Sequence, residues 1–178
     1  MSLEEFKKSL EQAPIIKKGD YSYIVHPILD GIPEIQPEML QDVVSEMKKH
    51  LEAYGHIDKI VTIEAMGIPL ATALSLEMNI PFCIIRKRSY GLPDEVSTEQ
   101  KTGYSTSTLY INGLKKGENV VLVDDIISTG GTLRAVLSAL KDIGVNVKGV
   151  VVAVDKDNHS EYIEKGFHIE LISLINIR

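Results

Sequence analysis

Two adjacent carboxylates, Asp124 and Asp125, stand directly after an apolar run at residues 120–123. Two more apolar residues follow, and then a short stretch of hydroxyl and glycine residues: Ser128, Thr129, Gly130, Gly131 and Thr132. The apolar run predicts a buried strand, and the helical spacing of apolar residues after Thr132 predicts a helix. The carboxylates and the turn therefore fall between a strand and a helix, where open α/β sheets bind their ligands.

These residue types suit a ligand that combines a phosphate and a sugar. The first N–H groups of a helix and the positive end of its dipole attract a phosphate, and glycines let the backbone approach it closely. Hydroxyl groups add donors, and carboxylates before the turn accept hydrogen bonds from sugar hydroxyls. The alternative is an ordinary strand–turn–helix with a threonine cap. The stretch has neither the Gly-Lys-Ser/Thr of a P-loop nor the GxGxxG pattern.

Short apolar runs alternate with helical patterns along the chain, as expected for an α/β protein with a parallel sheet covered on both faces. Strands are predicted at residues 21–25, 59–63, 81–85, 107–111, 119–123, 147–154 and 169–175. Helices are predicted at residues 2–12, 37–54, 67–78, 132–143 and 160–165. Residues 87–106 show no periodicity, which predicts a long functional or mobile loop.

Length and charge restrict the class of protein. A chain of 178 residues fits one domain, and its formal net charge of −6 argues against a nucleic-acid or anionic-membrane partner. The single cysteine, Cys83, lies in an apolar run and predicts a buried thiol, and the five histidines show no metal-ligand spacing. The absence of a signal-peptide core and of an apolar run near about 20 residues predicts a cytoplasmic protein.

The stretch from residue 120 to residue 132 resembles the signature with which type I phosphoribosyltransferases bind 5-phosphoribosyl-1-pyrophosphate (PRPP). The signature has four apolar residues, two acids, two apolar residues, a small residue and Thr-Gly-Gly-Thr. The resemblance extends over about residues 60–157, and the wider chain is most similar to the archaeal-type hypoxanthine/guanine enzymes, relatives of adenine phosphoribosyltransferase. It implies a type I phosphoribosyltransferase fold in a single domain, residues 1–178, whose residues 1–36 contribute a small N-terminal hood.

The resemblance also implies which residues hold PRPP. Asp124 and Asp125 match the pair that holds the ribose hydroxyls, and residues 128–132 match the 5′-phosphate loop. The pyrophosphate-binding positions are Ala65, Met66, Gly67, Arg86, Lys87 and Arg88. Met66 stands where the adenine enzymes have an arginine, so the basic run at residues 86–88 is expected to supply the missing contact. The alternative for that run is a solvated surface cluster.

Residues 87–106 match the flexible catalytic loop of the family, which closes over the reacting sugar and excludes water. Tyr104 fits the aromatic position of that loop. The adenine enzymes carry a glutamate where this chain has Gly103, and many 6-oxopurine enzymes carry an aspartate where this chain has Ser128. The group that handles the proton of the base is therefore open, with Glu99 as a candidate and a solvated loop glutamate as the alternative.

The base is expected to lie near Lys156, which resembles the lysine that donates to the 6-oxygen in hypoxanthine/guanine enzymes. An ammonium offers only donors, so it suits a carbonyl and disfavours the amino group of adenine. The alternative is a surface lysine after a strand. The segment at residues 23–30 is expected to form the hood over the base, with Val25 and His26 as candidates, although a structural role for His26 is the preferred interpretation.

The reaction that the resemblance implies is the transfer of phosphoribose from PRPP to hypoxanthine, and also to guanine, with release of pyrophosphate. Mg²⁺ is expected as the cofactor, bound through PRPP and not by protein side chains alone. A homodimer is expected from the same resemblance. Two alternatives stay open: adenine or orotate as the base, or a non-enzymatic PRPP-sensing regulator on the same fold.

Overall fold

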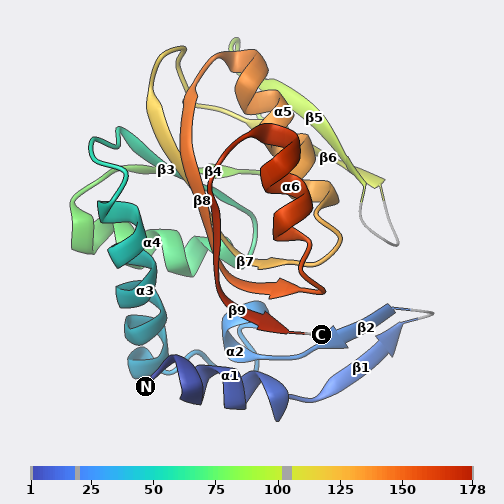
Figure 1. Ribbon diagram of the computed structural model, residues 1–178. Coiled ribbons are helices and arrows are strands. Elements are labelled where there is room, and N and C mark those ends of the chain that lie inside the picture. The colour runs from blue at the N-terminus through green and yellow to red at the C-terminus, as the bar shows by residue number, and fades with distance from the viewer. Residues whose placement is uncertain (1, 19–20, 102–105, 178) are drawn as a thin grey trace.

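The computed structural model describes residues 2–18, 21–101 and 106–177. A central sheet of five strands has the order β4-β3-β7-β8-β9, and every neighbouring pair is parallel (Figure 1). The strands are β3 (Lys59–Ile63), β4 (Phe82–Ile85), β7 (Asn119–Ile127), β8 (Asn146–Lys156) and β9 (Leu171–Ile177). This sheet confirms the predicted α/β class, and helices cover both of its faces.

Successive residues of the central strands alternate between two apolar cores. Ile60 and Val121 pack on one face with α1 (Leu3–Glu11), α2 (Pro27–Asp30), α3 (Pro37–Glu52) and α4 (Gly67–Met78). Val61 and Leu122 pack on the other face with α5 (Gly131–Ile143) and α6 (Ser160–Phe167). Because both faces are buried, the strands are apolar almost throughout instead of alternating with polar residues. This explains why the continuous apolar runs in the sequence located these strands well.

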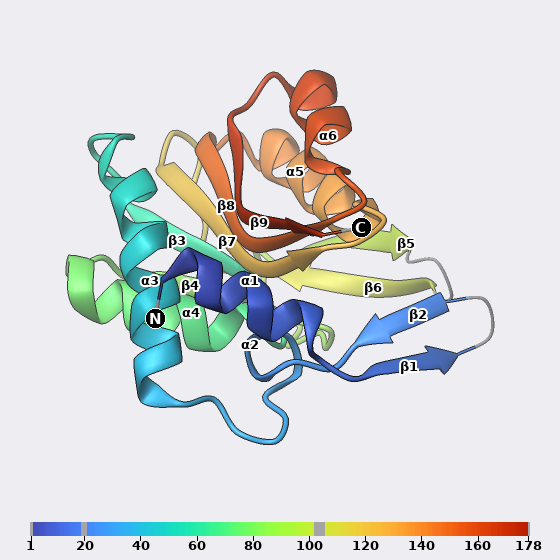
Figure 2. The ribbon, with the colours of Figure 1, turned by 60° about the horizontal axis from the view of Figure 1, so that its bottom comes forward.

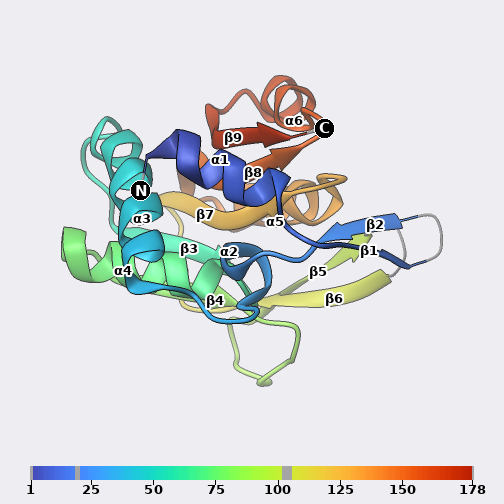
Figure 3. The same cartoon turned by 90° about the horizontal axis from the view of Figure 1, so that it is seen from below.

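Two antiparallel hairpins lie outside the central sheet. One pairs β1 (Ile15–Lys18) with β2 (Tyr21–Ile24), and the other pairs β5 (Val96–Lys101) with β6 (Thr106–Ile111). Figures 2 and 3 show both hairpins at the same end of the molecule. Residues of both hairpins line one cavity, so the hairpins form part of its wall.

The sequence did not predict β1, α2 or β5, and the strand β5 corrects the prediction that all of residues 87–106 form a loop. The strand β5 forms by backbone pairing with β6. Residues 96–101 do not alternate between apolar and polar side chains, so the sequence does not predict a strand there. The predicted strands at residues 119–123 and 147–154 also end too early. Both continue through polar residues, so Asp124, Asp125 and Lys156 lie within strands.

Two further expectations concern the whole chain. No helix among the described residues is long and apolar enough to cross a membrane. Cys83 is partly buried on β4, and burial raises the pKa of its thiol to about 11. A thiol with a raised pKa is a poor nucleophile, which agrees with the inert role expected from its apolar neighbours.

Candidate active site

A cavity of about 550 Å³ opens at the carboxyl ends of β3, β7 and β8. The β2 strand, the turn after β3, the β5–β6 hairpin and the end of β7 all contribute to its wall. The residues that line it include Ser22, Asp30, Glu64, Ala65, Met66, Lys87, Gln100, Ser107, Asp124, Asp125, Ile126, Ser128, Thr132 and Lys156. Parallel sheets bind ligands at this edge because loops and helix N-termini converge there.

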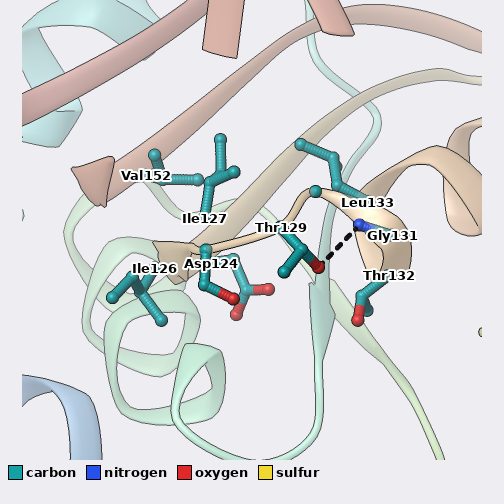
Figure 4. A pocket seen from close by; sticks show the side chains of 10 residues that line it. Asp124, Ile126, Ile127, Thr129, Gly131, Thr132, Leu133 and Val152 are labelled. Atoms are coloured by element: carbon teal, nitrogen blue, oxygen red, sulfur yellow. Dashed lines mark hydrogen bonds between the residues drawn. The ribbon is translucent and has the colours of Figure 1, made fainter. Parts of the chain in front are cut away.

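The turn between β7 and α5 forms a small adjoining cavity of about 50 Å³ (Figure 4), lined by residues 126–133. Gly130 has a φ of 72°, a left-handed conformation that an L-residue rarely adopts. Thr129 Oγ1 accepts a hydrogen bond from the Gly131 N–H at 3.5 Å, and Arg134 donates to the Thr129 carbonyl at 3.1 Å. The first turn of α5 therefore points its N–H groups at a cavity of the size that suits one phosphate.

Asp124 and Asp125 lie side by side at the floor of the larger cavity. Asp124 Oδ1 accepts a hydrogen bond from the Asp125 N–H at 3.1 Å, and Asp125 is buried. Burial raises the pKa of Asp124 to about 6, although the nearby Lys87 charge acts to lower it. Burial, and next the charge of Asp124, raise the pKa of Asp125 well above its ordinary value. A pair of this kind is stabilised in its charged form by a cation or by hydroxyl donors.

The turn after β3 packs directly against this acid pair. A Cβ atom at Gly67 would lie 2.1 Å from Thr62 Oγ1 and 2.7 Å from Asp124 Oδ1, so only glycine fits there. The Glu64–Ala65 peptide bond is cis, and Gly67 opens α4 with no side-chain cap on its N–H groups. The predicted pyrophosphate positions 65–67 therefore lie at a helix start beside Asp124.

The basic run at residues 86–88 divides into three environments. Arg86 Nε donates to a Glu64 carboxylate oxygen, and Arg88 lies 5.0 Å from the ring centroid of Tyr90. Lys87 lines the cavity and is close enough to influence the pKa of Asp124. The structure thus brings Lys87 to the acid pair, whereas Arg86 and Arg88 are each engaged by another side chain.

Lys156 lies at the other side of the cavity, at the end of β8. Its Nζ donates a hydrogen bond to the Ser22 backbone carbonyl of β2 at 2.8 Å. Ile24 and Ile126 also line this cavity. A cavity that contains a cationic donor and apolar side chains can bind a flat ring that carries a carbonyl oxygen.

Val25 and His26 are not brought to Lys156. They line a separate cavity of about 300 Å³ with Met39 and three prolines. His26 is buried, its Nδ1 accepts from the Ile28 N–H at 3.2 Å, and its Nε2 lies 3.0 Å from Ser9 Oγ. Burial lowers the pKa of His26. One ring nitrogen is bonded at the start of α2 and the other to Ser9 of α1. The structure therefore assigns His26 a structural position and does not support the base-site candidates.

Two candidate site residues, Glu99 and Tyr104, come from the predicted loop. Glu99 is exposed on β5, and its neighbour Gln100 is buried, lines the cavity and donates to Ser107 Oγ at 2.6 Å. Successive side chains of a strand point to opposite faces, so Glu99 is directed away from the cavity. Tyr104 lies outside the described residues.

The sequence interpretation did not identify Ser22, Gln100 or Ser107 as cavity residues, and it included Asp30 only as the end of the hood segment at residues 23–30. Asp30 accepts a hydrogen bond from the His26 N–H at 3.0 Å, and its charge contributes to the raised pKa of Asp125. Because successive side chains of a strand point to opposite faces, Gln100 could have been identified only if residues 96–101 had been recognised as a strand. Nothing in the hood segment at residues 23–30 distinguishes Asp30 from its neighbours as a site residue.

Comparison with known proteins supplies the family. A family model described as the phosphoribosyl transferase domain matches residues 34–175. The chain belongs to the phosphoribosyltransferase family. It is 50% identical over 177 residues to the hypoxanthine/guanine phosphoribosyltransferase of Methanocaldococcus infernus, covering 99% of this chain and 94% of that protein. It is 49% identical over 176 residues to the enzyme of the same name from Ferroglobus placidus, covering 98% and 93%.

Solved structures of phosphoribosyltransferases share the fold. The Giardia lamblia adenine enzyme, complexed with 9-deazaadenine, superposes with a TM-score of 0.82 at 23% identity and covers 100% of this chain and 99% of that chain. The adenine phosphoribosyltransferase of Thermoanaerobacter pseudethanolicus has a TM-score of 0.81 at 24% identity and covers 99% and 100%. At this level of identity the likeness establishes the phosphoribosyltransferase fold and leaves the base to be argued from the site.

Proposed function

We propose that this phosphoribosyltransferase transfers the phosphoribosyl group of PRPP to hypoxanthine and guanine, giving IMP or GMP and pyrophosphate in purine salvage. The observation that carries the proposal is the position of Lys156, whose ammonium lies in the same cavity as the acid pair and the 5′-phosphate turn. Relatives named hypoxanthine/guanine phosphoribosyltransferase, about half identical over nearly the whole chain, support the same base class.

PRPP fits the cavity in one orientation. The 5′-phosphate occupies the small cavity at residues 128–132, where α5 begins, and the ribose hydroxyls bond the carboxylates of Asp124 and Asp125. The pyrophosphate group lies against the N–H groups at residues 65–67, with Lys87 as the nearby cation. Met66 offers no charge, so Lys87 has the larger share of the pyrophosphate contact.

The acid pair fits a requirement for Mg²⁺. Carboxylates are hard oxygen donors of the kind that Mg²⁺ prefers, and burial disfavours their charged forms unless positive charge is close. Mg²⁺ held near Asp124 and Asp125 through PRPP would neutralise the charge of the pyrophosphate leaving group. Among the described residues, no cluster of three or more metal-binding side chains forms a site without substrate.

Catalysis in this site consists mainly of positioning and electrostatics. The C1′–oxygen bond to pyrophosphate breaks as the bond from the base nitrogen to C1′ forms, and the ribose carries positive charge in between. The base releases its imidazole N–H proton in the same reaction, so that the nucleotide product is neutral at the base. The carboxylates of Asp124 and Asp125 hold the ribose and stabilise that charge. The segment at residues 87–106, in which strand β5 replaces part of the predicted loop, is proposed to exclude water over the reacting sugar, with Tyr104 at the aromatic position of that segment.

The base is proposed to lie against Ile126, with its 6-oxygen directed at Lys156. Adenine carries an amino group at that position, and the ammonium has no acceptor to offer it. The regulator alternative is disfavoured by the net charge of −6, which does not suit DNA binding. A cytoplasmic homodimer is part of the proposal. The location follows from the charge of PRPP and the nucleotides, which do not cross membranes unaided, and the dimer rests on the family resemblance alone.

The test is nucleotide formation from PRPP and MgCl₂ with hypoxanthine, guanine, adenine or orotate offered singly. Hypoxanthine and guanine are expected to be converted efficiently and adenine poorly, and chelation of the metal is expected to stop the reaction. Efficient conversion of adenine with little conversion of hypoxanthine would contradict the base assignment. PRPP binding without any nucleotide product would favour the regulator alternative.

A further inference from the structure

One polar side chain interrupts the buried apolar part of β3. Thr62 is 0% exposed, and its strand neighbours Val61 and Ile63 are both buried and apolar. Valine has nearly the shape of threonine and a similar preference for strands, so packing alone does not require a hydroxyl at this position. A buried polar group that packing does not require calls for another explanation.

The hydroxyl of Thr62 has no hydrogen-bond partner among the residues that the structure describes. Thr72 on α4 shows the ordinary arrangement, because its Oγ1 donates to the Ile68 carbonyl at 2.8 Å. A donor that is buried without a partner has given up its hydrogen bonds to water and receives none in return. The hydroxyl of Thr62 therefore lowers the stability of the ligand-free protein.

The unpartnered oxygen faces the acid pair. Thr62 Oγ1 and Asp124 Oδ1 lie 2.1 Å and 2.7 Å from one point, the position that a Cβ atom would take at Gly67. Glycine leaves that point empty, so residue 67 places no side chain between the two oxygens. Asp124 Oδ1 accepts the Asp125 N–H at 3.1 Å, and a carboxylate oxygen has a second lone pair for another donor. A small turn of the Asp124 carboxylate would bring it within hydrogen-bond distance of Thr62.

We infer that Thr62 is a positioning residue for PRPP, whose hydroxyl donates to the Asp124 carboxylate when PRPP and Mg²⁺ are bound. This inference rests on the proposed PRPP site and is independent of which base is accepted. The hydroxyl is fully buried, so it acts on the ligand through Asp124 and not by contact. The hydrogen bond holds the carboxylate in the orientation that receives the ribose hydroxyls, and its charged acceptor makes it a strong one.

The hydrogen bond favours binding because it forms only in the complex. An interaction shifts an equilibrium only when it differs between the two states. The hydroxyl is unpaired in the ligand-free protein and paired in the complex, so its removal should weaken the complex and spare the free protein. The alternative is that Thr62 only fills space in β3, in which case its hydroxyl has no effect on PRPP binding.

Two substitutions separate the hydroxyl of Thr62 from its methyl group. Thr62→Val keeps the shape and removes the hydroxyl, so the ligand-free variant is expected to unfold at the temperature of wild type or at a higher one. Thr62→Ser keeps the hydroxyl and removes a buried methyl group, so it is expected to unfold at a lower temperature. Calorimetric titration with PRPP in the presence of MgCl₂ should give the opposite order. The dissociation constant is expected to rise about 10-fold in Thr62→Val and to stay within about 3-fold of wild type in Thr62→Ser.

The matched control is Thr72→Val, which removes a hydroxyl that already has a partner, and its dissociation constant for PRPP should match wild type. In steady-state kinetics Thr62→Val should raise the KM for PRPP and hardly change the KM for hypoxanthine, because β7 lies between β3 and the strand that carries Lys156.

Wild-type affinity for PRPP in Thr62→Val, or a joint loss of stability and PRPP binding in that variant, overturns the inference. It is also overturned if Thr62→Ser binds PRPP as weakly as Thr62→Val. Failure of the wild-type protein to bind PRPP overturns the proposed function instead.

Discussion

At the scale of single residues, Asp124 and Asp125 are held in the cavity at an electrostatic cost that a bound ligand offsets. The Asp124→Asn, Asp125→Asn double variant keeps the size of both side chains and removes their charge. We expect turnover to fall below detection while the variant folds, because the ribose and the positive charge at C1′ lose their partners. Steady-state kinetics and circular dichroism check this. Near-normal turnover would refute the assignment of the ribose site.

A second residue-scale prediction separates the members of the basic run. Lys87 lines the cavity, whereas Arg88 stacks near Tyr90, so only Lys87→Met removes charge from the proposed pyrophosphate site. The KM for PRPP is expected to rise about 10- to 100-fold in Lys87→Met, the size of a lost charge-assisted hydrogen bond. Arg88→Met is the control, and it is expected to change the KM for PRPP by less than about 3-fold. Equal effects of the two substitutions would show that the run acts as a diffuse charge.

The sequence identified the site residues that belong to a recognisable local sequence pattern. The acid pair, the 128–132 turn, Lys87 and Lys156 do meet in connected cavities. It did not locate Ser22 or Gln100, and it suggested Val25, His26 and Glu99, which the structure places elsewhere. Their positions depend on which face of a short element each side chain takes. That choice is made by tertiary packing, such as the burial of His26 against Phe6.

At the scale of elements, the start of α4 is packed so closely against β3 and β7 that a methyl group does not fit. Gly67→Ala would place Cβ 2.1 Å from Thr62 Oγ1 and 2.7 Å from Asp124 Oδ1. We expect it to destabilise the fold by about 1–3 kcal/mol and to weaken PRPP binding by displacing Asp124. Thermal unfolding and calorimetric PRPP titration measure the two effects.

The control for that substitution is Gly166→Ala on α6, where a Cβ atom would meet nothing within 4 Å. Alanine is the better helix former, so this change is expected to be neutral or slightly stabilising. PRPP binding in the control should match wild type. Unchanged stability and PRPP affinity in Gly67→Ala would mean that the pyrophosphate turn and the acid pair are not in contact.

Helical periodicity and continuous apolar runs predicted most of the elements that bury apolar side chains, with the short helix α2 as an exception. All five strands of the central sheet and the helices α1, α3, α4, α5 and α6 were expected from the sequence, with ends displaced by a few residues. The strands β1 and β5 were not expected. Their residues are mixed in polarity, and they form by pairing with β2 and β6. These two hairpins also line the cavity, so the least predictable elements are those that shape the site.

At the scale of the whole molecule, the acid pair makes stability depend on pH. The folded-state pKa of Asp124, about 6, lies above its ordinary value of 3.8. Between these values the folded protein binds a proton that the unfolded chain has lost, so the free energy of unfolding falls as the pH rises. The raised pKa of Asp125 extends the fall to higher pH. The contribution of the acid pair to the melting temperature of the ligand-free protein is therefore expected to be more favourable at pH 5 than at pH 8.

The double variant with two asparagines isolates this contribution. Burial lowers the pKa of His26, which acts in the opposite direction, but His26 is present in both proteins. The melting temperature of wild type minus that of the variant should therefore become more negative from pH 5 to pH 8. Saturation with PRPP and Mg²⁺ should reduce this trend in wild type. A difference that does not vary with pH would show that the carboxylates are not buried charges.

The central claim is that a lysine in the PRPP cavity reads the 6-oxygen of the base, and kcat/KM for hypoxanthine in Lys156→Met tests it most directly. Loss of a charged hydrogen bond of about 1.5–3 kcal/mol predicts a fall of about 10- to 100-fold. The KM for PRPP should hardly change, and Lys165→Met, at an exposed position, should match wild type in both constants. An unaltered kcat/KM for hypoxanthine in Lys156→Met, or a wild type that prefers adenine, would contradict the account.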